Sequence, residues 1–292
     1  MKKQYEITEF STLSDLFDKL DNVEMVSDVD TLCWFALPID KSIGDILTNK
    51  FIRKALSSSV ESNYFDKIEQ FFNQSSKVAP AAFSELFGIL NRCSESPGLC
   101  LVLPLVVSGK VKEVNVLVMG VDKFFYIVIN PMVVALLDEK EIDFLIGYQC
   151  GHILENNLTI FTVYSLLNNY KNKNRIFGGM VSGMIAIPIS YWYQCSEITS
   201  DRGGAICCGD LDVTQRMILC SEYGYNAIKN DGCKDMIAQC KSEQRDVIKN
   251  LFEHDAVHSI ASKRLLAIGM LNKAIESKNA QEINEKIINY VK

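Results

Sequence analysis

The sequence predicts a mostly helical α+β protein with one small sheet of about three strands. Apolar residues recur at steps of three and four along most of the chain, which is typical of amphipathic helices. Between residues 99 and 130 they gather instead in short runs rich in Val, Ile, Leu and aromatic residues, as in strands. With 292 residues and 48% hydrophobic content, the chain can bury a sizeable core.

The N-terminal third is predicted to be helical. The stretches "FSTLSDLFDKL", "NKFIRKALSSSV" and "NYFDKIEQFFN" have apolar residues at helical spacing, and Ser11 and Thr12 are candidate N-caps. We therefore interpret residues 9 to 95 as helices. Residues 1–98 then form an N-terminal region that packs on a core formed by residues 99–292.

The predicted strands are "LCLVLPLVV" (99–107), "VNVLVMGV" (114–121) and "KFFYIVIN" (123–130), with Gly and Asp turn residues between them. A helix follows, opened by Asp138 and Glu139. Its predicted buried face consists of Ile142, Leu145, Ile146, Ile153 and Leu154.

Further helices are predicted towards the C-terminus. "CSEITSDRGGAICCGDLDVTQRMIL" (195–219) indicates a helix that is broken by its glycines and restarted by Asp212 or Thr214. Residues 225 to 278 are also predicted to be helical.

The charges argue against a nucleic-acid partner. The net charge of −6 arises from 30 basic and 36 acidic residues without long runs, so no basic patch for phosphates is expected. The start, "MKKQYEITEFSTL", has no apolar core of a secretion signal, and we expect a cytoplasmic protein. Its ten cysteines include no Cys-x-x-Cys pair, which favours reduced, buried thiols.

One apolar segment, "IFGGMVSGMIAIPISYW" (176–192), follows the basic "KNKNR". It is short and rich in glycine for a span of about 20 residues. We interpret it as a buried helix, and membrane association through residues 176–192 remains the alternative.

The stretch "GYQCGH" on the predicted 138–154 helix carries unusual polar residues. Tyr148 and His152 are four residues apart and therefore share a helix face. Gln149 points into the apolar row of that helix. A buried glutamine and a buried histidine both need hydrogen-bonding partners.

Three segments in this order, "LLDEKEIDFLIGYQCGHI", "SEITSDRGGAICCGD" and "HSIASKRLLAIGMLNKAIES", resemble the zinc metallopeptidase family of HtpX and the CAAX prenyl proteases, a gluzincin family (peptidase family M forty-eight). The resemblance covers nearly the whole chain and is closest over residues 115 to 264. It implies a zincin-like core in which the sheet packs on the motif helix.

By this resemblance, His152 matches the second histidine ligand of zinc and Glu197 matches the third ligand, in a Glu-x-x-x-Asp element. Asp201 matches the carboxylate that supports a ligand histidine, and Arg202 follows it as in the family. His258, with Arg264 six residues later, resembles the late His-Pro segment, although Ser259 replaces the proline, and Asn115 matches the asparagine of an Asn-Ala-Phe element.

The departures lie at the catalytic centre. In a His-Glu-x-x-His helix, two imidazoles hold the metal and the glutamate polarises the attacking water. Tyr148 stands at the first-ligand position and Gln149 at the general-base position, where an amide cannot accept a proton at neutral pH. His152 and Glu197 then remain as an insufficient set of ligands, so we expect no cofactor, or zinc if there is one.

The carboxylates of Glu197 and Asp201 are one helical turn apart and are expected to be buried. A buried carboxylate pair is costly without a cation. If zinc is absent, Arg202, Arg264, His152 or His258 must supply the charge, so we hypothesise that a salt-bridged cluster replaces the metal.

These observations predict a catalytically inactive metallopeptidase-like protein, or pseudopeptidase. It would bind a peptide along the sheet edge or a partner protein, such as a catalytically intact relative. One alternative is an active zinc metalloendopeptidase in which Tyr148 phenolate or the Gln149 carbonyl contributes to the metal site. Another is a helical interaction protein whose polar core residues are structural.

Overall fold

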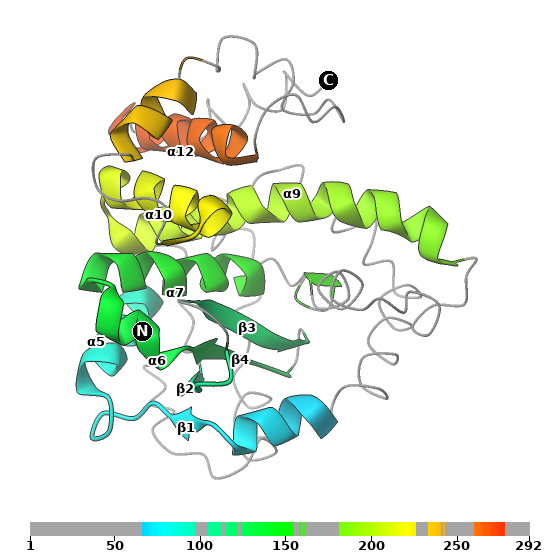
Figure 1. Cartoon of the computed structure of the whole chain (residues 1–292), viewed down its shortest axis with the longest axis vertical. Helices are drawn as coiled ribbons and strands as arrows, with labels where there is room; N and C mark the ends of the chain where they lie inside the picture. Colours follow the sequence, from blue (N-terminus) through cyan, green and yellow to red (C-terminus); the bar gives the residue numbers. More distant parts are fainter. Residues whose placement is uncertain are drawn as a thin grey trace, which may run out of the picture.

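The computed structural model places the sheet beneath a stack of helices (Figure 1). Helix α7 (Glu139–Leu154) lies on the sheet, α9 (Val181–Cys208) and α10 (Leu211–Tyr223) cover α7, and α12 (Ile260–Ser277) lies outermost. For 121, 124, 154, 181–191, 194, 260 and 274–277 only the backbone is described. The structure describes residues 66–96, 104–111, 115–121, 124–154, 158, 160–161, 181–225, 233–240, 242 and 260–277.

The sheet has four strands in the order β1-β2-β4-β3. They are β1 (Ser76–Lys77), β2 (Leu105–Val107), β3 (Val116–Val121) and β4 (Phe124–Ile129). β2 pairs with β4 in parallel, and the other two pairs are antiparallel. The last three lie within the predicted strand segments.

Strand β1 corrects two expectations, because it makes a fourth strand and lies in a region that we interpreted as wholly helical. Ser76 pairs with Val107 and Lys77 with Val106. A strand of two residues is too short to show a period in the sequence, and only its pairing with β2 defines it.

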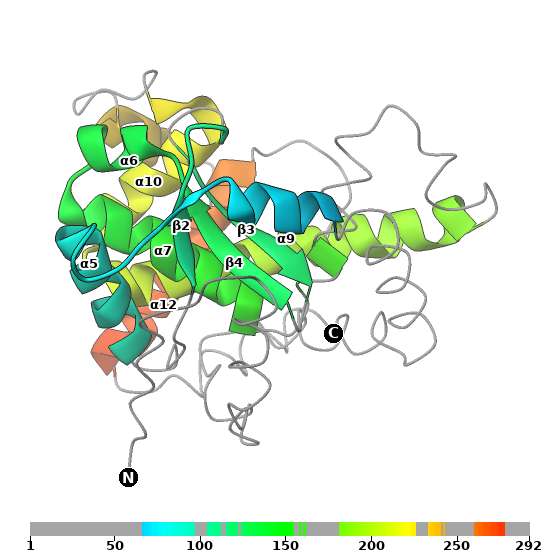
Figure 2. The same ribbon diagram turned by 90° about the horizontal axis from the view of Figure 1, so that it is seen from below.

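Both faces of β4 are covered, which explains its uninterrupted apolar sequence. Ile127 and Ile129 belong to the core between the sheet and the helices above it. Tyr126 and Val128 face the opposite side, where they pack with Phe72 of the helix at residues 66–73. Figure 2 shows this helix lying across the lower face of the sheet.

Helix α7 begins where the sequence predicts. The Asp138 carboxylate accepts a hydrogen bond from Glu141 N (2.9 Å), and the Glu141 carboxylate accepts one from Asp138 N (2.8 Å). This reciprocal pair is a capping box. Its predicted buried face is confirmed at Ile142, Ile146 and Ile153, which are at most 6% exposed, and Leu145 is partly buried.

Two shorter helices complete the described N-terminal and central parts. Helix α5 (Ser84–Glu95) packs against α7 with Leu86, Ile89 and Leu90 buried. Helix α6 (Pro131–Leu136) follows β4 and is capped by the Asn130 side chain, which accepts a hydrogen bond from Met132 N. The helical expectation for residues 9 to 65 falls outside the described residues.

Helix α9 runs unbroken through Gly203 and Gly204, so the expected break at these glycines is wrong. A Cβ atom on Gly203 would lie 2.7 Å from the carbonyl oxygen of Gly147 on α7. A Cβ atom on Gly151 would lie 2.6 Å from Ser200 Cα. These glycines let α7 and α9 approach closely, which outweighs their low helix propensity.

The helix ends instead at Cys208 and is followed by Gly209, whose φ of +63° favours glycine. Asp210 then caps α10 by accepting hydrogen bonds from the backbone of Asp212 and Val213. The predicted restart at Asp212 or Thr214 was therefore late by two or more residues. The sequence favours Asp at this position, but two other capping residues follow it closely.

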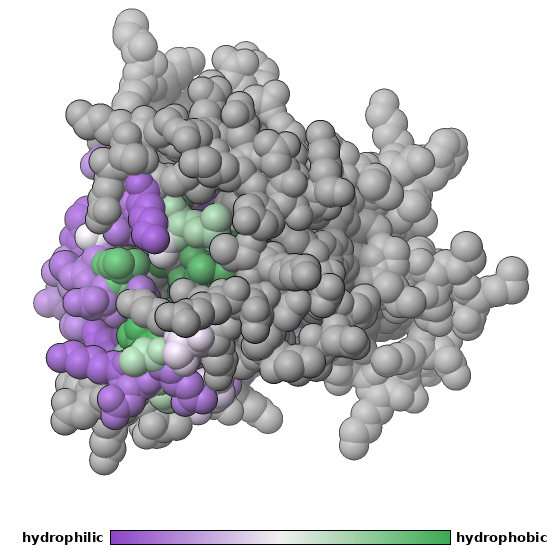
Figure 3. Space-filling view, turned by 90° about the horizontal axis from the view of Figure 1, so that it is seen from above, coloured by the Kyte–Doolittle hydropathy of each residue, from purple (hydrophilic) through white to green (hydrophobic). Residues whose placement is uncertain are grey.

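Residues 181–192 of the apolar segment form the first part of α9, in which Trp192 is fully buried. Residues 176–180 lie outside the described residues. None of the described helices has the length and apolar character needed to cross a membrane. In the described part of the face seen from above, hydrophobic residues lie among hydrophilic ones (Figure 3).

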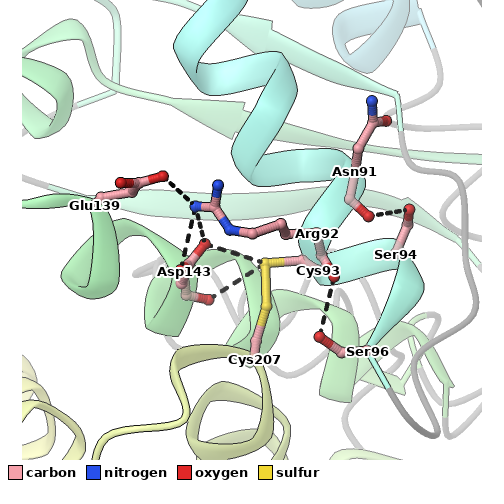
Figure 4. Close-up of a disulfide and its surroundings, with 8 residues drawn as sticks. All are labelled: Asn91, Arg92, Cys93, Ser94, Ser96, Glu139, Asp143 and Cys207. Atoms are coloured by element: carbon pink, nitrogen blue, oxygen red, sulfur yellow. Dashed lines mark hydrogen bonds and ion pairs between the residues drawn. A yellow bond between two sulfur atoms is a disulfide. The ribbon is translucent and has the colours of Figure 1, made fainter.

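A disulfide joins Cys93 of α5 to Cys207 of α9 (Figure 4). This pair corrects the expectation that all cysteines are reduced. Because 114 residues separate the two cysteines, only the tertiary fold brings them together. Six further described cysteines are buried and form no disulfide: Cys150, Cys195, Cys208, Cys220, Cys233 and Cys240.

Candidate functional site

The structure brings Tyr148, His152 and Glu197 together between α7 and α9. The Tyr148 hydroxyl donates a hydrogen bond of 2.6 Å to Glu197 Oε2. His152 Nε2 lies 3.7 Å from Glu197 Oε1. The three positions that match metal ligands by the resemblance thus lie close together between the two helices.

Gln149 points away from this point towards the sheet. Its Nε2 donates to the carbonyl of Val116 (2.9 Å), and its Oε1 accepts from Val118 N (3.0 Å). The side chain is 4% exposed, and both ends of its amide are paired with strand β3. The expected need for partners is met by the backbone, so this amide joins the motif helix to the sheet.

One helical turn along α9 from Glu197, Asp201 is held by Arg264 of α12. Arg264 Nε and Nη2 donate to the two carboxylate oxygens, each over 2.7 Å. Both side chains are almost fully buried, at 0% and 3% exposed. This two-pronged geometry is the strong form of an arginine–carboxylate pair.

Arg264 also links Asp201 to the rest of the cluster. Its Nη1 donates to Glu222 (2.7 Å) and to Ser221 Oγ (3.0 Å), and it lies 3.7 Å from Glu197 Oε2. Desolvation acts against the charge of Arg264, but the neighbouring Asp201 outweighs it and holds the guanidinium pKa well above its usual value. Burial raises the pKa of Asp201 to about 6 against the opposing effect of Arg264, so its carboxylate is ionised at neutral pH.

His152 lies in an aromatic, desolvated environment. Its ring centroid is 5.0 Å from that of Tyr148 and 4.2 Å from that of Phe161, and Nδ1 is 3.2 Å from Ser196 Oγ. Desolvation lowers the pKa of His152 to about 4, against the opposing charge of Glu197. The imidazole is therefore neutral at physiological pH.

Tyr148 is a protonated phenol in this setting. Burial, followed by the nearby Glu197 carboxylate, raises its pKa well above 10. Arg264 lies 5.9 Å from the centre of its ring, within reach of a cation–π contact. The hydroxyl therefore serves as a hydrogen-bond donor to Glu197.

A catalytic zinc site requires three protein ligands and an open position. His152 Nε2 and Glu197 Oε1 are buried, and neither has a hydrogen-bond partner among the described residues. They offer two ligand atoms, while Tyr148 retains its proton and the Arg264 guanidinium lies beside Glu197. These residues do not fit a zinc ion as they stand.

A second group of metal-binding type lies elsewhere, where Cys93, Asp143 and Cys207 bring one ligand atom each within 4.8 Å of one another. The two cysteines are bonded to each other. Asp143 is paired with Arg92, whose Nη2 donates over 3.1 Å and 3.3 Å to the two carboxylate oxygens.

The other predicted residues take different places. Arg202 is buried on α9, at 1% exposed. Asn115 is exposed at the start of β3, where its Oδ1 accepts from Val116 N over 2.8 Å. His258 lies outside the described residues.

Sequence reasoning missed four residues that complete the site: Ser196, Phe161, Ser221 and Glu222. Ser196 is adjacent to Glu197 and was the easiest to find. Ser221 and Glu222 carry no signal, because α10 contacts Arg264 only in the folded chain.

Comparison of the chain with protein-family models, with curated proteins and with solved structures found no match. The case for a function therefore rests on the residues and their geometry.

Proposed function

We propose that this chain is a non-catalytic, metallopeptidase-like protein that binds a peptide or a partner protein. The observation that carries the proposal is the hydrogen bonding of Gln149, because both ends of its amide bond to the backbone of Val116 and Val118. A general base must be able to accept a proton from water within hydrogen-bond reach. The residue at the general-base position lacks both the chemistry and the freedom for that task.

The neighbouring cluster supports the absence of a metal. Arg264 neutralises Asp201 and lies beside Glu197, and Tyr148 donates to Glu197. A cation near a carboxylate pair reduces the cost of burying it, so this cluster does not depend on zinc for its charge balance.

The binding surface that we propose lies along β3, the last strand in the described sheet. Gln149 accepts from Val118 N and donates to the carbonyl of Val116, as one residue of a parallel neighbouring strand does. An extended peptide that added to this strand would use the same kind of backbone bond. A peptide at this position would therefore either displace the Gln149 amide from β3 or pair with β3 beyond the two backbone groups that Gln149 occupies.

The decisive experiment restores the missing groups with Tyr148→His and Gln149→Glu together. The first change adds an imidazole one turn from His152 and directed at Glu197, and the second adds a carboxylate. We expect the unmodified chain to leave casein intact with or without zinc. We expect the double variant to bind zinc and to cleave casein in a chelator-sensitive way.

The single variants are the matched controls. Tyr148→His alone should bind zinc without cleaving casein, and Gln149→Glu alone should do neither. Because Gln149→Glu places a carboxylate against the Val116 carbonyl, circular dichroism must show that the variants fold. A Tyr148→His variant or a double variant that folds but takes up no zinc would contradict the proposed peptidase-like scaffold.

One observation favours a second candidate, an active zinc peptidase with non-standard ligands. His152 Nε2 and Glu197 Oε1 face each other as buried atoms without hydrogen-bond partners. Tyr148 would have to complete such a site as a phenolate, which its raised pKa opposes. Chelator-sensitive cleavage of casein by the unmodified chain would favour this candidate.

A further inference from the structure

The Cys93–Cys207 bond lies at a corner where three helices meet (Figure 4). Cys93 belongs to α5, Cys207 to the last turn of α9, and Asp143 of α7 lies against the sulfur of Cys93. Arg92, beside Cys93 in sequence, joins the same corner through ion pairs to Asp143 and to Glu139 (2.6 Å).

The surroundings of Cys93 suit a thiol as well as a disulfide. Cys93 Sγ lies 3.7 Å from the carbonyl oxygen of Asp143 and 3.8 Å from its Oδ1. Both oxygens are hydrogen-bond acceptors, and a disulfide sulfur has no hydrogen to donate to them. A reduced Cys93 would donate its S–H to either one, so the reduced state gains a hydrogen bond that the oxidised state lacks.

The two cysteine residues differ in their exposure. Cys93 is fully buried, whereas Cys207 is partly exposed. Arg92, which covers this corner, has a side chain that is 49% exposed. An incoming thiolate therefore reaches Cys207 first, and Cys93 is the leaving group.

We propose that Cys93 and Cys207 form a reversible thiol–disulfide modification site whose reductant is a dithiol. One thiolate of the dithiol attacks Cys207 Sγ, forms a mixed disulfide and displaces Cys93 as a thiolate, which takes up a proton. The second thiolate of the dithiol closes on the first sulfur and releases Cys207, which is protonated in turn. Two electrons and two protons pass to the cysteine pair, and the dithiol becomes a disulfide.

The fold survives both states. Without the bond, α5 keeps its buried Leu86, Ile89 and Leu90 and the ion pairs of Arg92 with α7. What is lost is the link between α5 and the C-terminal end of α9, the helix that carries Glu197. This assignment rests on the corner itself and does not depend on the proposed function.

A metal site at the same corner is the less favourable assignment. Asp143 is already engaged by Arg92, whose Nη2 donates to Asp143 Oδ1 over 3.1 Å. A dithiol–disulfide pair needs no third ligand, so Arg92 and Asp143 can stay paired in both states.

The test uses the full chain under native conditions. After incubation with a glutathione disulfide buffer, and then with dithiothreitol, the reagent is removed, the chain is denatured so that buried thiols react, free thiols are alkylated, and the peptides are analysed by mass spectrometry. We expect a Cys93–Cys207 linked peptide in the first sample and alkylated cysteines in the second. Renewed exposure to glutathione disulfide should restore the link. We expect the melting temperature to fall by roughly 10 °C on reduction and to recover on reoxidation.

Variants separate this pair from other thiols. Cys207→Ser should melt at the lower temperature and lose its response to dithiothreitol, whereas Cys208→Ser, next to it in sequence, should respond like the unmodified chain. Three results would overturn the proposal: no linked peptide under oxidising conditions, a link that dithiothreitol cannot break without denaturant, or a link that does not reform. The peptide analysis decides the question even if the Cys207 variant does not fold.

Discussion

Glu197 and Asp201 are buried carboxylates one turn apart on the same helix, yet their surroundings differ. Both oxygens of Asp201 accept hydrogen bonds from Arg264. Glu197 receives one hydrogen bond, from Tyr148, and its Oε1 has no hydrogen-bond partner in the described part of the chain and faces His152 at 3.7 Å.

The cluster therefore has two ends. At the Asp201 end both carboxylate oxygens are paired, and at the Glu197 end one carboxylate oxygen has no partner among the described residues. The Asp201 end is closed by its own cation, so it can hold α9 and α12 together without any ligand. The Glu197 end leaves two buried polar atoms, His152 Nε2 and Glu197 Oε1, facing each other. Under the proposed function, the Glu197 end is the remnant of a metal site and the Asp201 end is its preserved support.

Removing the cation should produce the largest effect. Arg264→Met keeps the length of the side chain but leaves Asp201 buried without its partner. We expect the free energy of unfolding, measured by urea denaturation, to fall by about 3–5 kcal/mol. Arg264→Lys, the control, retains the charge but loses the two-pronged geometry and should fall by less. A loss below about 1 kcal/mol for Arg264→Met would show that the Asp201 end is not the support that we describe.

Acid should act through His152 at the other end. Its folded pKa of about 4 lies below the usual 6.5, so between these values the unfolded chain binds more protons. The stabilisation is complete above pH 6.5 and is lost as the pH falls towards 4, by up to about 3 kcal/mol.

The measurement is urea denaturation at several pH values between 7.5 and 4.5. His152→Gln keeps an acceptor for Ser196 but does not titrate in this range, so it serves as the control for the other groups. The unmodified chain should lose more stability on acidification than this variant. Equal losses would mean that His152 is not buried in its neutral form.

A smaller effect is expected from Tyr148→Phe, which removes the one hydrogen bond that Glu197 receives. The lost bond goes to a carboxylate, so we expect a decrease of roughly 1–2 kcal/mol in the free energy of unfolding. Tyr223→Phe, at an exposed position on α10, is the control for loss of a phenol hydroxyl. If Tyr148→Phe were stabilising, the hydrogen bond from the Tyr148 hydroxyl to Glu197 would not contribute to the stability of the folded chain.

Much of this arrangement was predictable because it depends on local pattern. The apolar period predicted α7, the runs of β-branched residues predicted β2 to β4, and the burial of Gln149 implied that it has partners. Arg264 was one of four residues named as a source of positive charge, and the structure pairs it with Asp201. The choice required the position of α12, which no local pattern contains.

The features that the sequence did not predict share a physical cause: each of them depends on contacts between segments that are distant in the sequence. Gly203 and Gly204 suggest a break in an isolated helix, but against Gly147 they allow close packing. Cys93 and Cys207 are far apart in the sequence, and β1 exists only through its pairing with β2.

The central claim is that the chain holds no catalytic metal, and the metal content of the unmodified protein tests it most directly. The protein would be purified without chelator, equilibrated with zinc, desalted and analysed by inductively coupled plasma mass spectrometry beside the Tyr148→His variant. We predict far less than one zinc per chain for the unmodified protein and close to one for the variant. Stoichiometric zinc that survives desalting in the unmodified protein, and that is lost from a Glu197→Gln variant, would contradict the account.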